Sequence, residues 1–174
     1  MKFRAVIFDL DGTLLDTIPL IRQTFIKVFH DLSIPWGNGE VLKTIGLPLR
    51  EVAEVYAPER VEEFMSLYAE FQSTRYRELT RVFPGTIETL DTLKNNGYRT
   101  AVVTSKRRPP ALAGMSLTGI DRYIEVAVTV DDVSRPKPDP ESVVRALDLL
   151  NTCSRDSLYV GDSWYDIQAG KQAG

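Results

Sequence analysis

The sequence predicts an α/β fold with a doubly wound, mostly parallel sheet, and three observations support this. Four short apolar runs, at 5–8, 100–103, 125–130 and 157–160, are typical of strands that are buried on both faces. Segments with helical periodicity separate the last three runs, so strands and helices alternate along the second half of the chain. A chain of 174 residues is long enough for one such domain with an insertion.

The first strand is followed by a helical region, from about 14 to 81, in which we expect no strand. Apolar residues recur there at steps of three and four, which predicts two long helices with one apolar stripe each. Pro19 and Pro58 suit the first turns of these helices, because a first turn does not use the hydrogen bond that proline lacks. Asp16 is expected to cap the first helix.

Four further helices are predicted between and after the remaining strands, at 86–95, 109–117, 139–150 and 166–173. Asp139 is suited to cap the third of these, with Pro140 in its first turn. Gly174 fits the C-terminal cap of the last helix. Because these helices connect parallel strands, they are expected to cover the faces of the sheet through right-handed crossovers.

We therefore expect a catalytic core with an inserted cap. Residues 1–15 and 83–174 are predicted to form a discontinuous, Rossmann-like core, and residues 16–82 an all-helical cap domain. Ligands of doubly wound sheets bind beyond the carboxyl ends of the strands. Since the insertion directly follows the first strand, it is expected to arch over that edge.

Polar residues occur where the predicted strands end. Asp9 and Asp11 follow the first strand, and their spacing of two places both side chains on one face. Gly12 lets the backbone turn sharply or approach a ligand closely. Thr104 follows the second strand and Asp162 the fourth. Because neighbouring carboxylates repel, the pattern favours a cation between them or a shared proton.

These side chains suit phosphoryl transfer. Carboxylates are hard oxygen ligands of the kind that Mg²⁺ prefers, and the ion would offset the charge of a phosphate. One carboxylate can attack phosphorus to form an aspartyl-phosphate, while a second acid protonates the leaving oxygen and later deprotonates water. Lys137 would neutralise the nucleophile and the phosphate, and the hydroxyl of Thr104 or Ser105 would hold the phosphoryl oxygens.

Four motifs resemble those of the haloacid-dehalogenase-like phosphatases, in the order of that family and over essentially the whole chain. They are Asp9-Leu10-Asp11-Gly12-Thr13, Thr104 after an apolar strand, Lys137 within 135–140, and Gly161-Asp162-Ser163-Trp164-Tyr165-Asp166. The resemblance implies a Mg²⁺-dependent enzyme with an α/β core and a helical cap. The family normally continues past 169–174 with another strand, so a C-terminal strand is expected to be missing here.

The resemblance also implies roles for individual residues. Asp9 is implied as the nucleophile and Asp11 as the general acid and base, while Thr104 and Lys137 contact the phosphate. The implied Mg²⁺ ligands are Asp9, the carbonyl oxygen of Asp11, and Asp162, with Asp166 as a supporting acid or outer ligand. The remaining candidates for contact with phosphate or substrate are Gly12, Thr13, Ser105, Lys106 and, in the cap, Arg50.

Within the family, the insertion resembles the small cap of the phosphoglycolate phosphatase group. Segments 83–85, 129–133 and 137–140 are similar to that group and to its bacterial inorganic pyrophosphatase relatives. This implies a small phosphorylated metabolite or pyrophosphate as the substrate. A β-phosphoglucomutase-like phosphotransferase is an alternative, but those relatives usually have Glu-Asp where this chain has Gly161-Asp162.

Other functions remain as alternatives on the same kind of fold. A phospho-accepting receiver also places acids at strand ends, but it lacks a long helical insertion. A non-catalytic interaction protein would not need the full set of acids. A calcium-binding loop does not fit, because Gly12 falls too early and Leu20 occupies the position of the closing glutamate.

Simpler roles are expected for several nearby side chains. Asp131 and Asp132 are interpreted as solvated loop acids, and Trp164 and Tyr165 as packing residues. The basic run 106–108 has the composition of a solvated face, although its nearness to Thr104 permits contact with an anionic substrate.

The amino-acid composition limits the classes of partner and metal site that the protein can have. A net charge of −3 without a long basic stretch argues against nucleic acid, and no apolar stretch approaches membrane-spanning length. Cys153 and His30 are the single cysteine and histidine, which excludes intrachain disulfides, thiolate zinc clusters and multi-histidine metal sites. Residues 1–4 show no secretory pattern, so we expect a cytoplasmic protein. The oligomeric state stays open.

Overall fold

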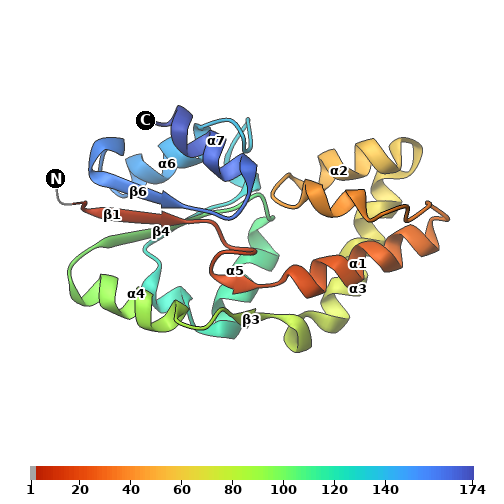
Figure 1. Cartoon of the computed structure of the whole chain (residues 1–174), viewed down its shortest axis with the longest axis horizontal. Coiled ribbons are helices and arrows are strands. Elements are labelled where there is room, and N and C mark those ends of the chain that lie inside the picture. The colour runs from red at the N-terminus through yellow and green to blue at the C-terminus, as the bar shows by residue number, and fades with distance from the viewer. Residues whose placement is uncertain (1–2) are drawn as a thin grey trace.

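The computed structural model describes residues 3–174, and a four-stranded parallel sheet forms its centre (Figure 1). The strands are β1 (Ala5–Phe8), β4 (Arg99–Val103), β5 (Val126–Val128) and β6 (Ser157–Val160). Their order is β5-β4-β1-β6, and each neighbouring pair is parallel. The chain thus builds outward from β1 in one direction and then returns to its other side with β6, which confirms the doubly wound fold.

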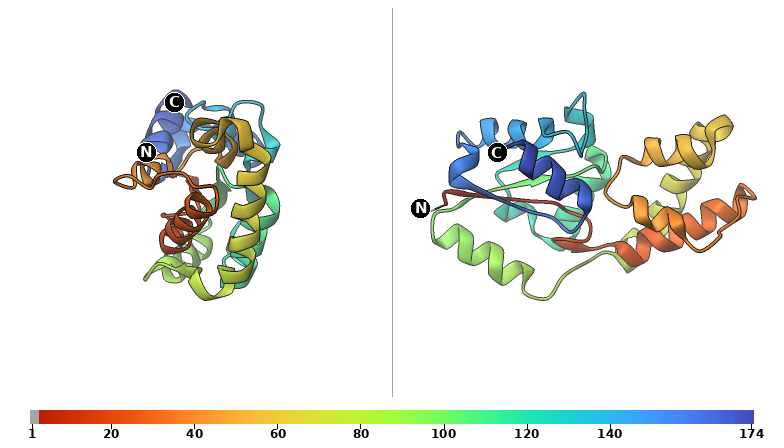
Figure 2. Two further views of the ribbon diagram at one scale, coloured as in Figure 1. Left: turned by 90° about the vertical axis from the view of Figure 1, so that its right-hand side faces the viewer. Right: turned by 45° about the horizontal axis from the view of Figure 1, so that its top comes forward.

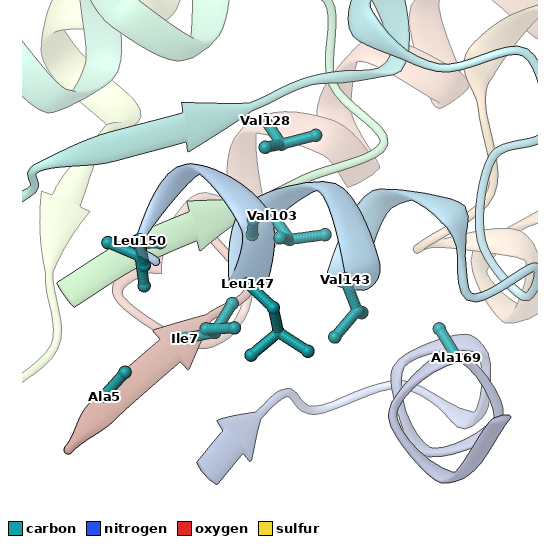
Figure 3. Close-up of a cluster of buried hydrophobic side chains, with 10 residues drawn as sticks. Ala5, Ile7, Val103, Val128, Val143, Leu147, Leu150 and Ala169 are labelled. Carbon is teal, nitrogen blue, oxygen red and sulfur yellow. The ribbon is translucent and has the colours of Figure 1, made fainter. Parts of the chain in front are cut away.

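Helices cover both faces of this sheet. They are α4 (Thr86–Asn95) and α5 (Arg108–Thr118) on one face, and α6 (Glu141–Leu149) and α7 (Trp164–Gln172) on the other. Successive side chains of β1 point to opposite faces. Val6 and Phe8 therefore pack with residues of α4 and α5, whereas Ala5 and Ile7 pack against α6 (Figure 3). Apolar burial on both faces explains why the strands are continuous apolar runs.

The insertion after β1 is helical and forms a separate apolar cluster. Its helices are α1 (Ile18–Asp31), α2 (Leu49–Tyr56) and α3 (Val61–Leu79), with short 3₁₀ turns at Glu40–Thr44 and Pro58–Arg60. Phe25, Phe29 and Phe64 are buried at the centre of this cluster. Figures 1 and 2 show these helices beyond the carboxyl ends of the parallel strands. The exact domain boundaries stay a prediction.

One expectation about the insertion is wrong, because two short strands lie within or at the end of the region predicted to contain none. β2 (Leu15–Asp16) and β3 (Arg81–Val82) pair antiparallel where the chain enters and leaves the insertion. A strand of two residues is too short to show alternation, so periodicity could not reveal it. The expectation that Asp16 caps α1 is also wrong. Asp16 belongs to β2, and Thr17 is the residue that precedes the helix.

Smaller differences concern helix ends. α6 begins at Glu141 and Pro140 is its N-cap, so the expectation that Asp139 caps this helix with Pro140 in its first turn is wrong. Asp139 instead holds the turn before the helix, since its Oδ1 accepts a hydrogen bond from the Glu141 backbone N–H at 2.9 Å. α7 begins at Trp164 rather than at residue 166. The Trp164 side chain is 64% exposed, so the expectation that it packs is wrong. Among residues 3–174, no helix is long and apolar enough to cross a membrane.

Candidate active site

The predicted site lies where the strand order reverses direction. Phe8 at the end of β1 is in register with Val160 of β6 on one side and Val102 of β4 on the other. The residues that follow these strands therefore meet at one edge of the sheet. In folds of this type, that edge is where ligands bind.

Three carboxylates meet at this edge. One oxygen from each of Asp9, Asp162 and Asp166 lies within 4.8 Å of the other two. Asp9 and Asp166 are buried, whereas Asp162 is exposed. Carboxylate oxygens gathered this closely are the donor chemistry that Mg²⁺ takes in proteins, so the residues present fit the implied ion.

Gly12 makes room for one of these acids. Its backbone has a φ of +90°, and a Cβ atom at this position would lie 2.4 Å from Oδ2 of Asp162. Thr13 fixes the same side chain, since its hydroxyl donates to Asp162 Oδ1 at 3.1 Å. Close approach of the turn after β1 to the loop after β6 therefore requires glycine at residue 12.

Lys137 links the two buried acids. Its Nζ atom lies 2.7 Å from Asp9 Oδ1 and 2.6 Å from Asp166 Oδ1, and its side chain is 1% exposed. Asp166 also accepts a hydrogen bond from the Tyr159 hydroxyl at 2.7 Å and one from the Ser163 backbone N–H at 3.0 Å. Two buried carboxylates thus share one ammonium group, which leaves the cluster with excess negative charge.

The pKa values of this cluster follow from burial and charge. Burial raises the pKa of Asp9 to about 7 in spite of the opposing charge of Lys137, and the charge of Asp166 adds to the rise. Burial also disfavours the charge of Asp166, but Lys137 and the hydrogen bonds from Ser163 and Tyr159 outweigh it and lower that pKa. Burial opposes the charge of Lys137 as well, yet Asp9 and Asp166 raise its pKa. Of these three side chains, Asp9 is therefore the one that needs additional positive charge nearby to be fully ionised at neutral pH.

Asp11 has different partners from Asp9. Its Oδ1 accepts hydrogen bonds from the Thr17 hydroxyl at 2.6 Å and from Lys106 Nζ at 2.7 Å, and Lys106 Nζ is 2.9 Å from its Oδ2. In the part of the chain that the structure describes, its carboxylate does not join the close group of three acids. The side-chain alternation that placed both acids on one face holds within a strand, and β1 ends at Phe8.

The predicted phosphate-binding hydroxyls lie on the loop after β4. Thr104 is buried, and its Oγ1 accepts a hydrogen bond from the Lys106 backbone N–H at 3.1 Å. The hydroxyl of Ser105 donates to the carbonyl oxygen of Gly46 at 2.6 Å, so here it links the core to the insertion. Their contact with phosphate stays a prediction.

Two acidic residues in the turn after β5 bind the start of α5, which directly follows the loop after β4. Asp131 accepts hydrogen bonds from Arg107 Nε at 3.1 Å and from the Arg108 backbone N–H at 2.9 Å. Asp132 Oδ2 accepts from Arg108 Nη2 at 2.6 Å and from the Thr129 backbone N–H at 2.8 Å. Although partial burial opposes it, these bonds lower the pKa of Asp132 to about 2. The interpretation of Asp132 as a solvated acid is therefore wrong, whereas Asp131 is exposed as expected but also bonds the loop.

A cleft of about 1200 Å³ separates this edge from the insertion. Six of the predicted site residues line it: Asp9, Asp11, Arg50, Thr104, Ser105 and Lys106. Arg50 lies on the cap side, with Nη1 2.8 Å from Glu62 Oε1. The remaining predicted residues, Gly12, Thr13, Lys137, Asp162 and Asp166, lie outside its lining.

The α3 wall of the cleft was not predicted from the sequence. Tyr68, Gln72 and Tyr76 line the cleft at helical spacing, and Gln72 Nε2 donates to the Tyr68 hydroxyl at 3.2 Å. Aromatic residues at that spacing indicate packing, and Tyr68 does pack on the buried cluster of the insertion. Gln72 is the one residue that could have indicated this wall, because a polar side chain on the apolar stripe of a helix needs a hydrogen-bond partner. In the structure it is buried.

Replacing Gly12 with alanine is expected to destabilise the protein by about 1–3 kcal/mol, because the residue would combine a positive φ with a Cβ atom too close to Asp162. It should also weaken Mg²⁺ binding, since Asp162 must move. Urea denaturation and metal titration measure the two effects. Gly97→Ala is a matched control: its φ is +75°, but nothing lies within 4 Å of the added atom, so it should lower stability alone.

Comparisons with known proteins agree with this geometry. Residues 6–174 match the model of the haloacid dehalogenase-like hydrolase family. The chain is 40% identical to pyrophosphatase PpaX of Bacillus velezensis, over 99% of this chain and 81% of that protein. It is 36% identical to pyrophosphatase PpaX of Halalkalibacterium halodurans, over 100% of this chain and 81% of that protein.

Solved structures show the same likeness. A protein of Bacteroides fragilis assigned as a haloacid dehalogenase-like hydrolase superimposes with a TM-score of 0.90 at 29% identity, covering 99% of this chain and 85% of that one. A predicted phosphoglycolate phosphatase of Haemophilus somnus shares the fold, with a TM-score of 0.88 at 24% identity, covering 100% of this chain and 83% of that one. The resemblance inferred from the four motifs is confirmed, and the chain belongs to the haloacid dehalogenase-like hydrolase family.

Proposed function

We propose that the protein is a Mg²⁺-dependent phosphatase that hydrolyses a small phosphorylated substrate through an aspartyl-phosphate on Asp9. The observation that carries this proposal is the position of Asp9. Its carboxylate lies at the cleft, 2.7 Å from the buried ammonium of Lys137, within a group of three acids. A nucleophile in such a place has a counter-charge beside it and access to a substrate.

Asp9 and Asp162 would hold Mg²⁺, with Asp166 as a supporting acid and the carbonyl oxygen of Asp11 as a further ligand. When bound, the ion supplies positive charge that keeps Asp9 ionised and offsets the charge of the phosphoryl group. Asp9 needs that charge, because burial raises its pKa to about 7. The ammonium of Lys137 also favours the ionised form of Asp9, since it donates to Asp9 Oδ1.

The reaction then has two displacement steps. A carboxylate oxygen of Asp9 forms a bond to phosphorus while the bond to the leaving oxygen breaks, and Asp11 gives that oxygen its proton. Water next attacks the phosphorus of the aspartyl-phosphate, Asp11 takes the proton of the water, and phosphate leaves with Asp9 restored. Thr104 would donate a hydrogen bond to a phosphoryl oxygen during both steps.

The relatives support two substrate types. Proteins at 36–40% identity are named pyrophosphatases, and a neighbour with the same fold is named a phosphoglycolate phosphatase. We propose a small phosphorylated metabolite or pyrophosphate, acted on in the cytoplasm. The cleft, with about 1200 Å³, has room for either.

Phosphate release from p-nitrophenyl phosphate, pyrophosphate and 2-phosphoglycolate tests the proposal. Turnover is expected with Mg²⁺ and not after its removal by a chelator. A receiver would instead take up phosphate once without continued release. Absence of release from all three substrates in the presence of Mg²⁺ would contradict the proposal.

Asp11→Asn is expected to slow both steps by about 10²–10⁴-fold, because an amide neither gives nor takes the proton. Mg²⁺ affinity should change little, since the ligand proposed at this residue is its backbone carbonyl. Steady-state kinetics and metal titration separate the two effects. Greatly weakened metal binding would argue against this division of roles.

A further inference from the structure

Lys106 holds the carboxylate that the proposed reaction requires. Its Nζ atom contacts both oxygens of Asp11, at 2.7 and 2.9 Å, and the Thr17 hydroxyl donates to one of them at 2.6 Å. The carboxylate of Asp11 lies outside the close group of acids around Asp9 among residues 3–174. Both oxygens of Asp11 are thus engaged by Lys106, and for Asp11 to exchange a proton with the leaving oxygen one of these contacts must be given up.

Burial distinguishes this ion pair from two others on the cleft. The side chains of Lys106 and Asp11 are 11% and 15% exposed, whereas Arg50 and Arg107, which are also paired with carboxylates, are 53% and 66% exposed. An exposed cation exchanges its partner for water at little cost. A buried ammonium that loses its counter-charge is strongly destabilised. Asp11 can therefore leave Lys106 readily only when another anion takes its place.

The surroundings keep Lys106 in position for such an exchange. Its Nζ lies 5.8 Å from the ring centre of Tyr76, a distance at which an ammonium is attracted by an aromatic face. The ring is itself held, because the Tyr76 hydroxyl donates to the carbonyl oxygen of Pro110 at 2.6 Å. Both Lys106 and Tyr76 line the cleft, so a group of the substrate beyond the transferred phosphoryl can reach them.

We propose that Lys106 is a positioning residue that exchanges Asp11 for an anionic group on the leaving part of the substrate and thereby frees Asp11 for proton transfer. A carboxylate and a second phosphoryl group both satisfy an ammonium, so either serves. A substrate with an uncharged leaving part leaves Asp11 on Lys106. This inference rests on the proposed function, because it assigns Asp11 to the reaction.

The test compares Lys106→Met with the unchanged chain on three substrates. 2-Phosphoglycolate carries a carboxylate on its leaving part, pyrophosphate carries a phosphoryl group, and p-nitrophenyl phosphate carries no anion there. For the two anionic substrates, kcat/KM is expected to fall by about tenfold or more through a raised KM, since a charge-assisted contact with the leaving part is lost. The kcat for these substrates should not fall, because Lys106 no longer holds Asp11. For p-nitrophenyl phosphate, KM should stay unchanged and kcat should not fall.

Two further variants separate positioning from structure. Lys43→Met is the matched control, because Lys43 forms an ion pair with Glu40 of the same 2.7 Å length but is 75% exposed, and it should behave like the unchanged chain. Lys106→Arg keeps the charge and should restore part of the preference for anionic substrates. If Lys106→Met does not fold, as judged by circular dichroism, Lys106→Gln takes its place in the same comparison.

Binding provides a readout that does not depend on turnover. Pyrophosphate binding to Asp9→Asn, measured by calorimetry with Mg²⁺, should weaken about tenfold when Lys106→Met is added. Equal losses on all three substrates, or unchanged pyrophosphate binding, would overturn the inference while leaving the proposed function intact. Absence of turnover in the unchanged chain on every substrate would instead refute the proposed function, and the inference with it.

Discussion

Asparagine in place of Asp9 is expected to abolish turnover, lowering the rate of phosphate release by about 10⁴-fold or more. The amide has the size of the carboxylate but is a poor nucleophile for phosphorus. The fold should persist, because Lys137 keeps Asp166 as a partner at 2.6 Å. Phosphate release with Mg²⁺ measures the effect, and circular dichroism verifies the fold.

Asp91→Asn is the control for this result. Asp91 is exposed, accepts a hydrogen bond from Asn95 within α4, and does not line the cleft. Its replacement should leave turnover unchanged. Near-normal phosphate release by Asp9→Asn would refute the assignment of the nucleophile, whatever the control shows.

Lys137→Met is expected to lower the free energy of unfolding by about 3–5 kcal/mol, the usual cost of removing one partner from a buried ion pair. The variant leaves Asp9 and Asp166 buried without their shared ammonium. Burial and mutual repulsion then raise the pKa of both carboxyl groups. Urea denaturation at neutral pH measures the loss, and turnover should be lost as well.

The charge explanation predicts how the loss is reversed. An acid whose pKa is higher in the folded than in the unfolded protein contributes stability as the pH falls, so Lys137→Met should recover stability on mild acidification. Mg²⁺ should also restore part of it. Adding Asp166→Asn removes one of the two unpaired charges and should recover stability at neutral pH. A uniform loss that none of the three changes relieves would indicate a packing defect instead.

The sheet could be predicted because its strands are apolar runs. A strand buried on both faces, such as Ala5–Phe8, is visible as an uninterrupted apolar segment, and the acid that follows it then falls at the sheet edge. The strand pattern alone therefore predicts that Asp9 and Asp162 lie together. It does not extend past the end of a strand, which is why the separate partners of Asp11 were missed.

Other features depend on contacts between distant segments, which periodicity does not encode. The ion pairs that Asp131 and Asp132 form with Arg107 and Arg108 join residues 24 apart in the chain. The hydrogen bond from Ser105 to Gly46 spans 59 residues. In the sequence, the acids and arginines resemble solvated residues and Ser105 resembles a phosphate-binding hydroxyl. Only the packing of the loops supplies the partners that they have in the structure.

The pairing of β2 with β3 has a consequence for how such proteins diversify. Leu15 stands opposite Val82, so the polypeptide leaves the sheet and returns to it through neighbouring points. The helices between β2 and β3 therefore form one long insertion whose two ends are adjacent. The entropic cost of closing a loop rises only slowly with its length. One insertion can therefore replace another without altering the strands. The catalytic residues at the sheet edge and the cap surface that faces them can then evolve independently.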